Sequence, residues 1–291
     1  TPIKSSAASD VYKRQVYEQP ALARQDGLWM LNNKRWGRIG GINGHGYNLT
    51  IGKDFLSDEH GYYGLLFDYG SNTVSGAAGS GEYDSYSLGL YAGNKNKPGS
   101  ITGFVSYGLQ ANKGTAYLPV LGQTAESDYD SKTLGIGVEY AYDLDYGKPE
   151  ELWHVSPYAR LNFNHYRQKA FREHGAGVFD RSFGSYSDNY AEGELGLSFD
   201  RSEGTGGYGI RLGYKRILTG ERQLMEVCFA EDECGSLLPV RSWGEGRNHF
   251  VAAAYVRHDF SRKWSAGGSL SGDWSNGGRE IGARLDLAYH F

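Results

Sequence analysis

The stretch "REIGARLDLAYHF" at residues 279–291 decides the fold class, because its residues alternate between two chemical kinds. Every second residue from Ile281 to Phe291 is apolar, and the residues between them, from Gly282 to His290, are mostly small or polar. A period of two is the pattern of a β-strand, whose successive side chains point to opposite faces of a sheet. In a soluble sheet such a strand would be an adhesive edge, so we expect a sheet that closes on itself.

The same alternation returns along the chain and gives twelve predicted strands. They are residues 28–38, 47–55, 62–69, 86–92, 101–109, 134–140, 153–163, 195–199, 210–214, 250–256, 266–274 and 279–291. Pro157 falls inside the seventh segment, where it cannot donate a ladder hydrogen bond, so we predict a bulge or local widening there.

The connections between these strands tend to alternate in length. Short ones are expected near 56–60, 94–98, 202–205 and 260–263, and long polar ones near 72–82, 112–128, 167–187 and 219–246. The segment 143–152 is longer, and 39–44 and 275–278 are shorter, than strict alternation requires. Short turns at one end and long loops at the other are typical of a transmembrane β-barrel.

Composition supports a closed β architecture and excludes other classes. The chain has 43 glycines and 23 tyrosines in 291 residues, and it has no apolar run long enough for a helical membrane span. A formal charge of −4 argues against a nucleic-acid partner. Cys228 and Cys234 lie in one polar segment with no zinc-like cluster around them, so we predict a local disulfide between them, with two free thiols as the alternative.

The faces opposite the apolar rows carry charged residues, as the lumen of an outer-membrane barrel does. We predict that six of them line the pore: Glu139, Arg160, Glu192, Glu194, Arg211 and Arg284. They would either form a generic polar lumen or hold basic residues of a preceding linker, for which Lys13, Arg14 and Arg24 are candidates. The histidines near strand ends, His249 among them, are expected to be solvated polar residues.

Four segments together resemble the C-terminal translocator domain of classical autotransporters, the type V secretion proteins. They are "GYNLTIGKDFLSDEHGYYGLLFDYGSN" (46–72), "GEYDSYSLGLYAG" (81–93), "WHVSPYARLNFNHYRQKAFREHGAG" (153–177) and the terminal strand. The resemblance runs from about Gly27 to Phe291. Each motif is loose alone, and their order and spacing make the combination specific.

The resemblance implies a closed antiparallel 12-stranded transmembrane β-barrel at residues 27–291, in the bacterial outer membrane. Residues 1–26 would be the linker, with a short N-terminal helix in the pore, although Pro20 interrupts a single helix and residues 1–15 differ in character from the rest. The barrel would anchor its precursor and permit surface export of its own N-terminal passenger.

The resemblance also implies partners and an assembly signal. The partners are outer-membrane lipid, the passenger, the barrel-assembly machinery and periplasmic chaperones, around a monomeric barrel without cofactor or enzymatic activity. The assembly signal would be the alternating apolar residues of the last strand: Leu285, Leu287, Tyr289 and Phe291. Two alternatives remain open: a stand-alone outer-membrane channel for small solutes, and an outer-membrane hydrolase, which would need Ser or Asp clustered with His.

Overall fold

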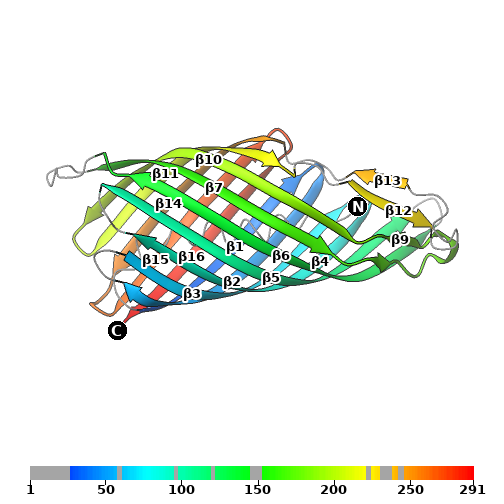
Figure 1. Cartoon of the computed structure of the whole chain (residues 1–291), viewed down its shortest axis with the longest axis horizontal. Helices are drawn as coiled ribbons and strands as arrows, with labels where there is room; N and C mark the ends of the chain where they lie inside the picture. Colours follow the sequence, from blue (N-terminus) through cyan, green and yellow to red (C-terminus); the bar gives the residue numbers. More distant parts are fainter. Residues whose placement is uncertain are drawn as a thin grey trace.

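A computed structural model describes residues 27–57, 61–94, 98–118, 122–144, 153–220, 224–229, 238–241 and 246–291. Twelve strands form one closed antiparallel barrel, as predicted (Figure 1). They are β1 (Gly27–Ile39), β2 (Ile42–Ser57), β3 (Gly61–Gly76), β4 (Gly79–Asn94), β5 (Gly99–Leu118), β6 (Gln123–Tyr142), β7 (His154–Gln168), β10 (Tyr186–Glu203), β11 (Gly206–Thr219), β14 (Asn248–Asp259), β15 (Trp264–Ser275) and β16 (Gly278–His290). The expected pore helix in residues 1–26 lies outside the described residues.

The first and last strands close the barrel. β1 pairs with β16 in antiparallel register from Gly27 opposite His290 to Ile39 opposite Gly278. The terminal alternating strand therefore has a partner on each side, because β15 pairs along its other edge. Closure removes the free edge that a row of alternating apolar residues would otherwise present.

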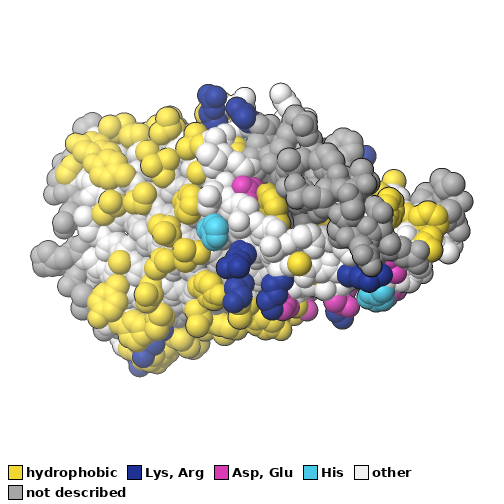
Figure 2. Space-filling view, turned by 45° about the vertical axis from the view of Figure 1, so that its right-hand side comes forward, with side chains coloured by type: hydrophobic (Ala, Val, Ile, Leu, Met, Phe, Trp, Pro, Cys, Tyr) yellow, Lys and Arg dark blue, Asp and Glu magenta, His cyan; other side chains and the backbone are white. Residues whose placement is uncertain are grey.

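The outer face of the barrel carries an apolar belt. Along the outer row of β6 the exposed residues change from charged to apolar, since Glu126, Asp128 and Lys132 are followed by Leu134 and Ile136. Figure 2 shows this division: yellow side chains cover one part of the surface, and dark blue and magenta ones gather beyond it. Exposed apolar side chains around a barrel with a polar interior are the arrangement that a lipid environment favours.

The belt has the height of a bilayer core. The apolar row of β16 runs from Ile281 to Phe291, which is about 33 Å along the strand at roughly 3.3 Å per residue. A strand tilt of about 40° reduces this to about 25 Å, the usual height of a lipid-facing band. Among the described residues, no helix is long and apolar enough to cross a membrane.

Two of the predicted long loops are wrong, because strands continue through them. β3 and β4 meet at a two-residue turn within the segment expected to be the loop 72–82, and β5 and β6 extend to Leu118 and from Gln123 within the segment 112–128. Above the belt both faces of a strand meet water or polar groups, so the apolar alternation disappears although the ladder hydrogen bonds continue. Judged by composition alone, these strand segments resemble a polar loop.

The two remaining long connections contain a small second sheet. Its order is β13 (Leu238–Arg241), β12 (Leu224–Phe229), β9 (Arg181–Phe183) and β8 (Phe171–Arg172), with a 3₁₀ turn at Gly177–Phe179. This sheet lies at the end of the barrel opposite the C-terminus (Figure 1). Because the longest connections of such barrels face the exterior, we name it the external sheet.

The external sheet is fixed to the barrel wall by aromatic stacking. The Phe171 ring stacks on Tyr129 of β6 with 4.3 Å between centroids, and on Phe183 of β9 with 4.4 Å. Burial raises the pKa of the Tyr129 phenol above its ordinary range. Cys228 of β12 is disulfide-bonded, while Cys234 lies outside the described residues, so the predicted pairing stays a prediction.

The predicted bulge at Pro157 is wrong. The register between β7 and β10 runs without a shift through Pro157, which lies opposite Leu197. The Val155 carbonyl accepts a hydrogen bond from the Leu144 N–H on the β6 side, and alternate residues of a strand point their backbone groups to the same side. Pro157 therefore faces β6, where the continuous ladder ends at Tyr158 and the Leu144–Val155 bond keeps the same register beyond it. The missing N–H interrupts this ladder without shifting its register.

Candidate functional site: the polar lumen

The barrel interior is lined by the polar residues that alternate with the lipid-facing ones. Glu139 on β6, for example, is buried between the exposed Val138 and Tyr140. All six charged residues that the sequence places on this face have little exposed side-chain surface: Glu139, Arg160, Glu192, Glu194, Arg211 and Arg284. The alternation of the strands therefore directs them away from the belt.

Arg160 lies at the centre of an ion-pair network on β6, β7, β10 and β11. Its Nη2 lies 2.6 Å from Glu139 Oε2, and its Nη1 lies 3.4 Å from Glu194 Oε2. Arg211 Nη2 lies 2.9 Å from the same Glu139 oxygen. The Arg211 guanidinium also stacks over the Tyr158 ring at 4.0 Å, and the Tyr158 hydroxyl donates to Glu194. The two arginines and two glutamates thus neutralise one another inside the barrel wall.

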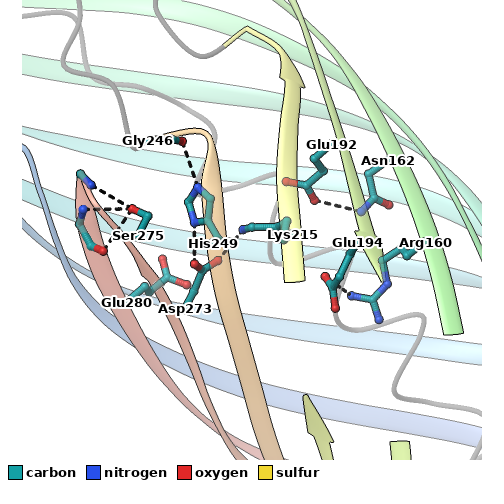
Figure 3. A network of polar contacts seen from close by, with 12 residues as sticks. Arg160, Asn162, Glu192, Glu194, Lys215, Gly246, His249, Asp273, Ser275 and Glu280 are labelled. Carbon is teal, nitrogen blue, oxygen red and sulfur yellow. Dashed lines mark hydrogen bonds and ion pairs between the residues drawn. The ribbon is translucent and has the colours of Figure 1, made fainter. Parts of the chain in front are cut away.

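Glu192 accepts hydrogen bonds from two neutral side chains. Asn162 donates a hydrogen bond to its Oε1 at 3.0 Å, and the Tyr190 hydroxyl donates to its Oε2 at 3.0 Å. Figure 3 shows Glu192 and Asn162 directed toward each other from neighbouring strands, above the pair of Glu194 and Arg160. Arg284 is not part of this group, since its ion pair joins it to Asp286 on β16 at 3.4 Å.

A second polar group, which sequence reasoning missed, joins β11, β14 and β15. Asp273 accepts hydrogen bonds from Lys215 and from His249, whose Nδ1 lies 2.7 Å away. His249 Nε2 lies 3.2 Å from the Gly246 carbonyl oxygen, so the ring spans from the strand to the loop before it (Figure 3). The prediction that His249 is solvated is wrong, because its side chain is 4% exposed. The available signal was that Asp273 and His249 lie next to the outward residues Trp274 and Phe250.

An apolar group occupies the interior near the other end of the barrel. Trp29 donates through its indole N–H to the Tyr91 hydroxyl at 2.9 Å, and Tyr91 in turn bonds to Asp54. The full cluster is Trp29, Leu31, Tyr62, Leu66, Tyr91, Phe104 and Ala288. This cluster adjoins the Arg160 network, because Glu139 lies opposite Thr102, whose hydroxyl shares a hydrogen bond with Tyr62.

Known proteins share the architecture described above. The family model described as the autotransporter beta-domain matches residues 28–271. No curated protein sequence matches the chain. Among solved structures, the chain is similar to the translocator domain of the autotransporter NalP from Neisseria meningitidis, with a TM-score of 0.79 and 18% identity over 99% of this chain and 97% of that one.

Two further structures have the same architecture. The beta domain of the Bordetella autotransporter BrkA gives a TM-score of 0.69 at 16% identity, over 92% of this chain and 100% of that one. The transport unit of AIDA-I from Escherichia coli gives 0.60 at 12% identity, over 97% and 98%. These likenesses establish the fold, and the family match covers most of the chain. The chain therefore belongs to the autotransporter beta-domain family.

Proposed function

We propose that this barrel anchors a precursor in the outer membrane and carries its own N-terminal passenger to the cell surface, with residues 1–26 as the linker inside the lumen. The family is one of outer-membrane translocator barrels that serve a passenger domain. The observation that supports the proposal most directly is the closed barrel with an apolar outer belt and a polar interior in which charges are paired. Such an interior lets a hydrated chain pass without exposing unpaired charge to lipid.

We further propose that the barrel catalyses no reaction and needs no cofactor. The charged groups of the two networks described above form ion pairs and hydrogen bonds that join neighbouring strands, as in the pairs of Arg160 with Glu139 and of His249 with Asp273. Such bonds stabilise the wall. The barrel-assembly machinery and periplasmic chaperones are proposed partners, with Leu285, Leu287, Tyr289 and Phe291 as the assembly signal, and the barrel is proposed to act as a monomer.

The linker proposal is carried by the glutamates of β10. Glu192 and Glu194 lie two residues apart on the inner face of β10, so both carboxylates are placed where a basic side chain of a linker in the lumen would pass, with Lys13, Arg14 and Arg24 as candidates. Changing Glu192 and Glu194 together to lysine should displace the linker and raise the single-channel conductance of the barrel in planar bilayers. Asp128→Lys, on the outer face above the belt, is the matched control. Unchanged conductance in the double variant would remove this role.

The export function is tested by fusing an epitope-tagged passenger ahead of residue 16 and expressing it in a Gram-negative host. We expect antibody and external protease to reach the tag on intact cells, and deletion of Phe291 to abolish this by blocking assembly. An inserted, heat-modifiable barrel whose tag stays in the periplasm would instead indicate a stand-alone channel or an enzyme.

A further inference from the structure

The outer surface at the β1–β16 seam contains two arginines at directly opposite positions of the two strands. Arg38 on β1 lies opposite Arg279 on β16, and both side chains are exposed on the outer face. Like charges directly opposite each other in a sheet are destabilising. Within the described residues, neither guanidinium has an acidic partner: the adjacent Glu280 points inward and pairs with Arg35.

The pair lies where the apolar belt ends. Directly below it along the same outer rows are Trp36 on β1 and Ile281 on β16, and Trp274 on β15 lies beside Arg279. The apolar row from Ile281 to Phe291 already spans the height of a bilayer core. Arg38 and Arg279 therefore lie at the headgroup level of the outer leaflet.

Other cationic and polar side chains point to the same place. Lys34, inside the belt, directs its Nζ up toward Trp36, with 5.3 Å to the ring centroid. Long basic side chains near a membrane border reach toward the interface in this way. Asn43, opposite Arg38 on β2, and His45, opposite Trp36, are also exposed and add hydrogen-bond capacity.

A second pair of opposed cations differs from the seam pair in having acidic residues nearby. Lys132 on β6 lies opposite Arg167 on β7, also above the belt. Near that pair, Asp130 forms an ion pair with Lys169 at 3.0 Å, so acidic groups are already present. The seam pair has no such neighbour on the outer face among the described residues. An anion from outside the chain would supply the missing negative charge.

We propose that Arg38, Arg279 and Lys34 bind the phosphate group of an anionic lipid in the outer leaflet, with its acyl chains lying against Trp36, Ile281 and Trp274. Two adjacent guanidinium groups match the several oxygen acceptors of a phosphate. The apolar surface directly below selects a lipid over a free phosphate ion. The lipid would also remove the repulsion between the arginines at the strand pair that closes the barrel.

The test uses the purified full chain and titrates phosphatidylglycerol, with phosphatidylcholine as the neutral counter-lipid, by native mass spectrometry. Each arginine lost should weaken phosphatidylglycerol binding about fivefold, and Arg38→Gln with Arg279→Gln together about twenty-five-fold. Lys53→Gln removes one exposed positive charge near the opposite border of the belt and should leave the affinity unchanged. Arg279→Lys keeps the charge and loses the planar fork, so it should weaken binding less than Arg279→Gln does.

Thermal unfolding gives a second readout. In phosphatidylcholine vesicles the double glutamine variant should be at least as stable as the wild-type barrel, because the repulsion is gone. Adding phosphatidylglycerol should raise the Tm of the wild type and not that of the variant. Equal lipid affinity of the double variant and wild type, or an equal loss in Lys53→Gln, would overturn the proposal. Full displacement of the lipid by inorganic phosphate at the same concentration would overturn its assignment to a lipid.

Discussion

Replacing Arg160 by methionine should lower the free energy of unfolding by about 3 kcal/mol. The guanidinium has contacts of 2.6 and 2.9 Å to Glu139 and of 3.4 Å to Glu194. After its loss Glu139 is still paired with Arg211, and Glu194 still accepts a hydrogen bond from Tyr158. Each carboxylate therefore keeps a partner. The cost therefore lies between that of a charged hydrogen bond, about 1.5–3 kcal/mol, and that of a broken buried ion pair, about 3–5 kcal/mol.

The measurement is urea unfolding of the refolded barrel in detergent micelles, followed by tryptophan fluorescence. Arg167→Met is the matched control, because Arg167 is an exposed arginine on the same strand and should change the unfolding free energy by less than about 0.5 kcal/mol. A double-mutant cycle with Glu139→Gln should give a coupling energy above about 1 kcal/mol. Equal losses for Arg160→Met and Arg167→Met, or a coupling near zero, would refute the view that this network stabilises the wall.

Three further changes test other parts of the molecule. Leu285→Arg places a charge in the lipid-facing row and should cost about 2–4 kcal/mol in the same urea titration; a negligible cost would contradict lipid contact. Gly196→Ala would press a methyl group against the Leu212 carbonyl oxygen and should cost about 1–3 kcal/mol, whereas Gly184→Ala meets open space and should be neutral. Phe171→Ala removes both aromatic stacks of the external sheet, so external protease should cleave there while the barrel stays heat-modifiable on gels.

Lipid contact determines which parts of the fold were predictable from sequence. Wherever a strand crosses the belt, one of its faces must be apolar. All twelve strands, from Leu28 to Phe291, can therefore be recognised in the sequence by their alternation. Above the belt that requirement ends. The upper halves of β5 and β6 carry polar residues on both faces, and their ladder pairs, such as Lys113 opposite Asp128, leave no periodic signal. The external sheet was missed for the same reason.

For the candidate site, the direction of each side chain was predictable from the sequence and its contacts were not. Side-chain direction follows from counting by twos, so the inward position of Glu139, Arg160 and Glu194 was predictable. Their contacts were not, because pairing depends on register: Arg160 lies directly opposite both glutamates, one on each neighbouring strand. The buried His249 was missed because its partner Asp273 is on the next strand, and local composition around a histidine contains no information on that neighbour.

The unequal strand lengths make the mouth of the barrel slanted. On one side β6 continues from Lys132 up to Gln123 beyond the belt, about 30 Å of additional strand. On the other side β1 and β16 end within a residue of Arg38 and Arg279. A polypeptide leaving along the axis would meet the extended strand wall on the first side and, among the described residues, no strand wall of that height on the second. Its exit is therefore biased toward the low rim, so the earliest residues to emerge are delivered beside the membrane surface rather than straight away from it.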